Sequence, residues 1–311
     1  MKKNRGLEKV AKVVSVFGSR PDRPAASVEP TSEKVRENKE KAASIAKAPV
    51  KPVVSHSGDL KKVRVNSLRP DVATLRGNRI LIGSDNESEA MAYKVLRTKL
   101  FKVMKENKWM SVGITSANPT EGKTTTAINL AYMLEQSIEL PVVLVDLDMH
   151  RPNVHKLLGI KPRYGIADYL RGEATLVEVI HRLKGANLLV LPGRTAESDC
   201  GRLLSSRAMK DFGRIMMELI GPCLIMYDMA PVLAVDDVMV FDGKDCNLVV
   251  TAESSTTTDD LATVMELLAD QNTVGYVLNK SRNSVKRTRY GYYYYYGYNY
   301  GSRGYASKAT T

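Results

Sequence analysis

The sequence predicts an α/β fold in which a mostly parallel sheet is flanked by helices on both faces. Three observations predict it: short branched apolar runs alternate with helical stretches, a glycine-containing loop joins one run to a helix, and aspartates follow two other runs. The chain has 311 residues, of which 43% are hydrophobic, so an ordinary core can form.

The first 80 residues are predicted to form a basic, mostly disordered arm, with 19 Lys and Arg against 8 Asp and Glu. From Ser19 to Ala73 the arm offers few apolar side chains to offset the entropy lost on ordering. Apolar positions between Leu7 and Phe17 suggest one short helix, and a nascent helix without a partner is an equal interpretation. The charge suits a nucleic acid, an anionic membrane or an acidic partner, or only a soluble linker.

The predicted body, residues 81 to 282, opens with an amphipathic helix over 87–105. Its apolar positions recur at helical spacing and are Met91, Val95, Leu96, Leu100 and Val103. Six strands are predicted, starting at Ser111, Val142, Asn187, Leu224, Asn247 and Val274, and helices are predicted over 124–136, 205–219 and 257–270. Ligands of such sheets bind at the carboxyl ends of the strands, where the candidate motifs also fall.

The apolar runs and the cysteines indicate the cellular compartment in which we expect the protein. No apolar run approaches the ~18 residues of a membrane span, and residues 1–12 lack the apolar segment of a secretion signal. Cys200, Cys223 and Cys246 lie far apart without metal-ligand spacing, which favours reduced structural thiols. We therefore expect a cytoplasmic protein.

A phosphate-binding loop is predicted between the strand at Ser111 and the next helix, which indicates a P-loop NTPase-like fold. Gly122 lets the backbone approach a polyphosphate, Lys123 reaches its outer phosphates, and the Thr124 hydroxyl can ligate Mg²⁺. Ala117 stands where the first glycine is usual, but the strand, loop and helix context makes a chance match improbable. The expected ATP-binding residues are Ala117, Asn118, Pro119, Thr120, Glu121, Gly122, Lys123, Thr124 and Thr125.

Three aspartates follow strands near this loop. Asp146 and Asp148 are two residues apart after the strand at Val142, and Asp228 follows the strand at Leu224. An aspartate at a strand end is more often a helix cap or a turn former, but three beside a phosphate loop shift the balance. We expect Asp228 and Thr124 to ligate Mg²⁺, Asp146 to act as the general base, and Asp148 to give electrostatic or metal-linked support.

Several weaker candidates surround this set. Asn279 can hydrogen-bond a base edge or form a turn, and Asp236 and Asp237 can face the site or cap a helix. His150 and His155 show no third metal ligand, so metal binding is left to Mg²⁺. The remaining candidates, for gating or phosphate contact, are His155, Arg151 and the loop Leu191 to Ser206.

Residues 283–311 form a basic, tyrosine-rich tail that is predicted to be disordered, because glycines interrupt any strand. A phosphate loop and many solvent-presented phenols in one chain suggest a tyrosine kinase that acts on itself. The expected acceptors are Tyr290, Tyr292, Tyr293, Tyr294, Tyr295, Tyr296, Tyr298, Tyr300 and Tyr305.

In these motifs the sequence resembles the cytoplasmic bacterial tyrosine autokinases of exopolysaccharide and capsule biosynthesis. The resemblance covers residues 81–305 and rests on ANPTEGKT, VVLVDLDMHRP, LIMYDMAP with VLAVDD, and the tyrosine cluster, in that order. It implies ATP as donor, Mg²⁺ as cofactor, and phosphorylation of the tail in trans between subunits. It also implies a membrane polysaccharide co-polymerase or chain-length protein as activator, peripheral placement at the inner face of the membrane through that partner, and a cognate tyrosine phosphatase. No nucleic acid is expected as a partner.

Two departures from the family pattern bear on assembly. The second motif has His150 where the family usually has Arg, with Arg at 151. The family's Glu, Arg and Arg ahead of the phosphate loop, which help to build a ring of subunits, correspond here to Met91, Lys94 and Arg97. We therefore predict a mainly monomeric or weakly associated free protein.

Two other functions remain open. A switch ATPase of the plasmid-partition or division-site type has the same sheet, but it carries a second lysine near the start of the loop, where this chain has Ala117-Asn118-Pro119. A nucleotide-binding assembly factor would use the tail to self-associate. Formation of phosphotyrosine separates both from the autokinase.

Overall fold

The computed structural model describes residues 14–17, 65–84, 87–253 and 255–281. Its strands are β1 (Val14–Phe17), β2 (Asn66–Leu68), β3 (Ser111–Ser116), β4 (Val142–Asp146), β5 (His181–Leu183), β6 (Leu188–Leu191), β7 (Leu224–Asp228), β8 (Cys246–Ala252) and β9 (Thr273–Ser281). Its helices are α1 (Val72–Gly77), α2 (Glu87–Asn107), α3 (Lys123–Glu135), α4 (Val154–Leu157), α5 (Ile166–Arg171), α6 (Leu176–Val179), α7 (Cys200–Leu204), α8 (Arg207–Ile220), α9 (Asp237–Val240) and α10 (Thr258–Leu267).

Within the described residues the strands form one sheet, in the order β1-β9-β8-β3-β7-β4-β6-β5-β2. Every neighbouring pair is parallel except β5 with β6. The six predicted strands are confirmed as β3, β4, β6, β7, β8 and β9. Because β3, β4 and β7 are adjacent and parallel, their carboxyl ends lie at one edge, where Asp146 pairs in register with Asp228.

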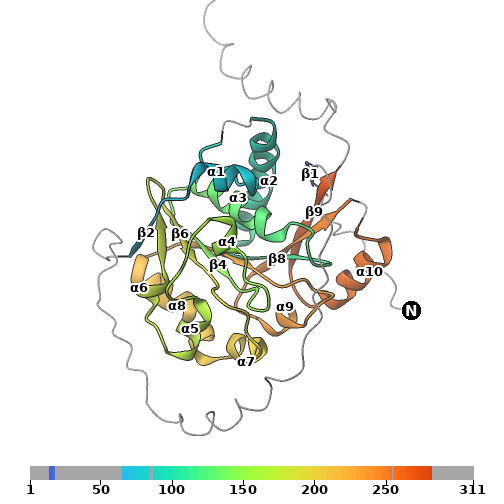
Figure 1. The fold of residues 1–311 in the computed structure, drawn as a ribbon. Helices are drawn as coiled ribbons and strands as arrows, with labels where there is room; N and C mark the ends of the chain where they lie inside the picture. The colour runs from blue at the N-terminus through green and yellow to red at the C-terminus, as the bar shows by residue number, and fades with distance from the viewer. Residues whose placement is uncertain (1–13, 18–64, 85–86, 254, 282–311) are drawn as a thin grey trace, which may run out of the picture.

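Helices cover both faces of the sheet, as the sequence predicts (Figure 1). One apolar layer contains side chains of α1, α2 and α3 together with Val142 and Leu144 of β4. The other contains side chains of α5 to α10 together with Val143 and Val145. This alternation along β4 follows from the opposite directions of successive side chains in a strand.

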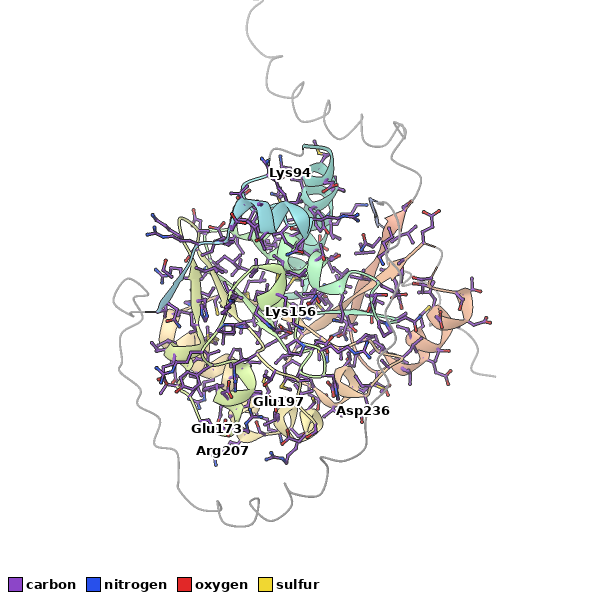
Figure 2. The ribbon with its side chains drawn as sticks, in the orientation of Figure 1. Lys94, Lys156, Glu173, Glu197, Arg207 and Asp236 are labelled. Carbon is purple, nitrogen blue, oxygen red and sulfur yellow. The ribbon has the colours of Figure 1, made fainter. Side chains whose placement is uncertain are left out.

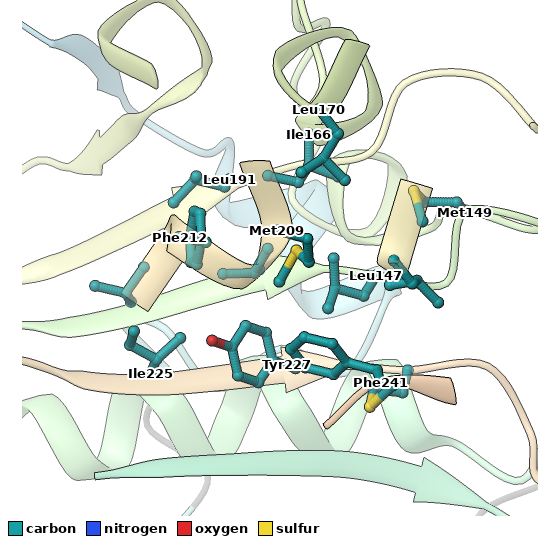
Figure 3. Packing of buried hydrophobic residues seen from close by; sticks show 14 of the residues in the cluster. Leu147, Met149, Ile166, Leu170, Leu191, Met209, Phe212, Ile225, Tyr227 and Phe241 are labelled. Carbon is teal, nitrogen blue, oxygen red and sulfur yellow. The ribbon is translucent and has the colours of Figure 1, made fainter. Parts of the chain in front are cut away.

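The second layer is built around aromatic rings (Figure 3). Tyr227 of β7 packs edge-to-face on Phe241, with 4.9 Å between the ring centroids, and also contacts Phe212 of α8. Such tilted arrangements are the favourable ones for aromatic pairs. This packing holds the end of β7, and with it Asp228, in a fixed position.

Three sequence expectations differ from the structure. Val14–Phe17 is a strand paired with β9 instead of part of a helix, in keeping with its β-branched and aromatic side chains. The body begins before residue 81, because β2 pairs with β5 and Leu68 and Leu75 are buried in the first layer. On α2 the buried side chains are Tyr93, Leu96, Leu100 and Met104, whereas Met91 and Val95 are exposed.

Candidate active site

The phosphate loop lies between β3 and α3, as predicted. Thr120 and Gly122 have positive φ angles of 67° and 96°, so the chain turns sharply before the first residue of α3. A Cβ at Gly122 would lie 2.2 Å from Nδ2 of Asn279, and the positive φ angle would strain any other residue, so the position favours glycine. The loop therefore presents the start of a 13-residue helix, a favourable place for phosphate.

Side chains from other elements hold the loop in this shape. Glu121 is buried, and its carboxylate accepts hydrogen bonds from the Asn118 amide, at 3.0 Å, and from the Thr256 hydroxyl. Asn279 at the end of β9 donates from Nδ2 to the Glu121 carbonyl oxygen at 2.8 Å. Asn279 thus contacts the loop itself, a role that its predicted contact with a base did not include.

Lys123 is the positive centre of the site. Its Nζ lies 2.6 Å from Oδ2 of Asp148 and 3.9 Å from Oδ1 of Asp228, and the side chain is only 10% exposed. Burial alone would lower the pKa of Lys123, but the charges of Asp228, Asp148 and Asp146 outweigh it and raise the pKa above its ordinary value. Lys123 is therefore charged whenever the acids around it are ionised.

The three predicted aspartates meet around this lysine, but their oxygens are bonded differently. Asp148 is fully engaged: Oδ2 pairs with Lys123, and Oδ1 accepts from the Arg151 amide at 3.0 Å. Asp146 accepts from the amides of Asn153 and Val154 through Oδ2 alone. Oδ1 of Asp146 and both oxygens of Asp228 are buried without a hydrogen bond of ordinary geometry to a described residue, and Asp228 has only Lys123 Nζ at 3.9 Å and the Thr124 hydroxyl beside it.

The incomplete hydrogen bonding of Asp146 and Asp228 is accompanied by raised pKa values. Burial raises the pKa of Asp146 to about 8, with the Asp228 charge acting in the same direction. Burial also raises the pKa of Asp228 to about 6, against the effect of Lys123. Buried carboxylate oxygens without partners are costly, and they are the ligands that Mg²⁺ prefers. Asp228, with the Thr124 hydroxyl at the start of α3, therefore fits a magnesium ion.

Some of the weaker candidates contact another candidate residue, and others are placed only by the helix to which they belong. His150 and Asp237 meet, with 3.3 Å between Nε2 and Oδ2, and Gly193 in the loop after β6 packs on Asp146, where a Cβ would lie 3.2 Å from Oδ2. His155 lies on α4 and Asp236 is the N-cap residue of α9, without a side-chain cap. The contact of Gly193 with Asp146 was missed, because no sequence signal joins that loop to β4. The expected tyrosine acceptors lie outside the described residues.

Comparisons with known proteins identify a nucleotide-binding domain. Residues 113–297 match the family described as the CobQ/CobB/MinD/ParA nucleotide binding domain. The tyrosine-protein kinase YwqD of Bacillus subtilis (strain 168) is 28% identical over 221 residues, which cover 70% of this chain and 92% of YwqD. The tyrosine-protein kinase Etk of Escherichia coli (strain K12) is 30% identical over 221 residues, which cover 68% of this chain but only 29% of Etk.

Solved structures also include similar folds. The kinase domain of the E. coli tyrosine kinase ETK superposes with a TM-score of 0.60 at 25% identity, covering 81% of this chain and 87% of that domain. The chimerical protein CapA2B2 superposes with the same TM-score at 21% identity, covering 70% and 95% of the two chains, and shows the likeness of fold alone.

Proposed function

The chain belongs to the CobQ/CobB/MinD/ParA nucleotide binding domain family, and from this premise we propose that it is an ATP-dependent protein-tyrosine autokinase. The observation that carries the proposal is the arrangement of Lys123, Asp146 and Asp228 at the phosphate loop, with buried carboxylate oxygens that accept no hydrogen bond of ordinary geometry. The similarity to YwqD and Etk, both described as tyrosine-protein kinases, supports this choice among the activities of the family.

In the proposed reaction a tail phenol attacks the γ-phosphorus of ATP. The new bond joins the phenol oxygen to phosphorus, the bond to the β–γ bridging oxygen breaks, and ADP leaves. Asp146 takes the phenol proton, and Lys123 stabilises negative charge on the outer phosphates. Mg²⁺, held by Asp228 and Thr124, would neutralise phosphate charge when bound.

The reaction would reverse the charge of its own substrate. Residues 280–311 carry seven Lys and Arg and no acid. Each phosphate adds roughly −1.5 to −2 charges, so a few modifications make the segment negative. We propose that this change releases the tail from an acidic face of a neighbouring subunit and loosens assembly. Equal association of phosphorylated and unphosphorylated protein at low salt would contradict it.

The proposed setting is exopolysaccharide or capsule synthesis, with phosphorylation in trans and a membrane co-polymerase as activator. None of the helices in the described part of the chain combines the length and apolar character that a membrane crossing requires. We propose that contact with the inner face of the membrane is made through that partner.

The test is to incubate wild-type and Lys123→Met protein with ATP and Mg²⁺, with and without a candidate activator segment, and to map phosphate by mass spectrometry. We expect phosphotyrosine between Tyr290 and Tyr305 in the wild type and a loss of about 100-fold or more in Lys123→Met. The matched control is Lys102→Met, since Lys102 lies on α2 with a side chain 75% exposed. Hydrolysis of ATP without phosphotyrosine under either condition would contradict the kinase and favour a switch ATPase.

A further inference from the structure

A second group of polar side chains lies at the same end of the sheet as Lys123, outside the proposed kinase machinery. It consists of His150, Cys200 and Asp237, and one donor atom from each lies within 4.8 Å of the others. His150 follows β4, Cys200 is the first residue of α7, and Asp237 is the first residue of α9. Figure 1 shows α7 and α9 together on one side of the sheet, and the two helices are in contact.

Two of the three side chains are buried, and the third reaches solvent. Glu197 and Asp236, which precede Cys200 and Asp237 in the chain, lie at the α7 and α9 end of the molecule, away from Lys94 of α2 (Figure 2). Cys200 is 2% and Asp237 1% exposed. The His150 side chain is 36% exposed, so the cluster can be reached from solvent on the histidine side.

The hydrogen bonding of the cluster is incomplete. Oδ2 of Asp237 is buried and makes no hydrogen bond of ordinary geometry to a described residue, although Nε2 of His150 is 3.3 Å away. The Cys200 thiol makes only a weak hydrogen bond, to the Glu197 carbonyl oxygen at 3.4 Å. A buried carboxylate oxygen with only a half-exposed imidazole beside it is incompletely compensated, and a cation between the three donors would offset that cost.

The donor atoms select the class of cation. An imidazole nitrogen, a thiolate sulfur and a carboxylate oxygen are ligands for zinc and similar transition metals, whereas Mg²⁺ prefers oxygen alone. Three protein ligands with a solvent-facing side are typical of a site that keeps its fourth position for water or another small ligand. We propose that His150, Cys200 and Asp237 bind a divalent transition-metal ion of the zinc class.

The metal would act on the kinase site through the chain. His150 is two residues from Asp148, whose carboxylate pairs with Lys123. The Arg151 amide donates to both the carbonyl oxygen and Oδ1 of Asp148, so residues 148–151 form one tight turn. Ligation of His150 would therefore hold the turn that positions Asp148.

The test is a Co²⁺ titration of chelator-treated full-length protein, read by absorption spectroscopy and by metal analysis after gel filtration. It needs no kinase activity, so it is independent of the proposed function. We expect one Co²⁺ per chain and a near-ultraviolet thiolate-to-cobalt charge-transfer band. The band should persist with saturating Mg²⁺-ADP, because the phosphate-loop site offers oxygen ligands.

Three variants make the assignment specific. Cys200→Ser should abolish the band, and Cys223→Ser, which changes another buried cysteine, should retain it. Disturbing only the support of a metal ligand costs about 10–100-fold in affinity, so His150→Arg at the half-exposed position should weaken binding at least that much. Absence of the band in the wild type, its persistence in Cys200→Ser, or its loss with Mg²⁺-ADP would overturn the proposal.

Discussion

Asp168 and Asp228 are both buried carboxylates, 3% and 0% exposed, and they differ in what surrounds their oxygens. Asp168 on α5 accepts from the Gly165 amide at 2.7 Å and from the guanidinium groups of Arg171 and Arg194. Asp228 makes no hydrogen bond of ordinary geometry to a described residue, and only Lys123 Nζ, at 3.9 Å, and the Thr124 hydroxyl lie beside it. A fully bonded acid stabilises its fold, whereas one with free oxygens is kept at a cost that a ligand can offset.

The pKa values follow the same division. Burial acts to raise the pKa of Asp168, but the hydrogen bond and charge of Arg194, the Gly165 amide and Arg171 outweigh it and lower the pKa. For Asp146 and Asp228 the effect of burial exceeds that of Lys123 and the hydrogen bonds, and the pKa values rise to about 8 and about 6. A raised pKa beside a phosphate loop is typical of a functional carboxylate.

The largest stability effect is expected at Asp168. Asp168→Asn removes the carboxylate that pairs with Arg194 and Arg171, of which Arg171 still keeps Glu197 and Glu173, and should lower the free energy of unfolding by about 2 kcal/mol at pH 7. Because the folded-state pKa is lowered, this stabilisation is present above the unfolded-state pKa and is lost as the pH falls through the folded-state value. Urea unfolding of the wild type and Asp168→Asn at pH 7 and pH 3 measures this stabilisation. An equal loss of unfolding free energy at both pH values would contradict an ionic contribution.

A change of opposite sign is expected at Asp146. Asp146→Asn keeps an oxygen for the amides of Asn153 and Val154 and removes a charge that is costly to bury, so it should raise the free energy of unfolding by about 1 kcal/mol or more at pH 8. Because the folded-state pKa is raised, the wild type loses stability as the pH rises from about 4 to about 8. The difference in the free energy of unfolding between Asp146→Asn and the wild type should therefore shrink toward pH 4. A difference that is the same at pH 4 and pH 8 would contradict this explanation.

The smallest effect is expected at the phosphate loop. Asn279→Ala removes the hydrogen bond to the Glu121 carbonyl oxygen and should weaken ATP binding by about threefold to tenfold. The matched control is Asn272→Ala, since Nδ2 of Asn272 donates to the Asp245 carbonyl oxygen, away from the loop. Isothermal titration with Mg²⁺-ATP measures both, and equal affinities would remove Asn279 from the support of the loop.

The sequence predicted the central strands well because buried parallel strands are continuous branched runs, such as Val142–Asp146. It also placed Lys123, Asp146 and Asp228, since each stands next to a strand or helix end. It missed β2 and β5, which have three residues each and carry too little pattern. It could not show that His150, Cys200 and Asp237 meet, because they come from three separate segments, the turn after β4 and the starts of α7 and α9, which only packing brings together.

The most direct test measures phosphotyrosine and urea unfolding together, at pH 8, for Asp146→Asn and Asp168→Asn. The account predicts that Asp146→Asn is more stable than the wild type and forms no phosphotyrosine. Asp168→Asn should be less stable and keep most of its phosphotyrosine at a temperature where it is folded. Phosphotyrosine formation by Asp146→Asn, or a loss of stability in that variant as large as in Asp168→Asn, would contradict the distinction between the two kinds of buried acid.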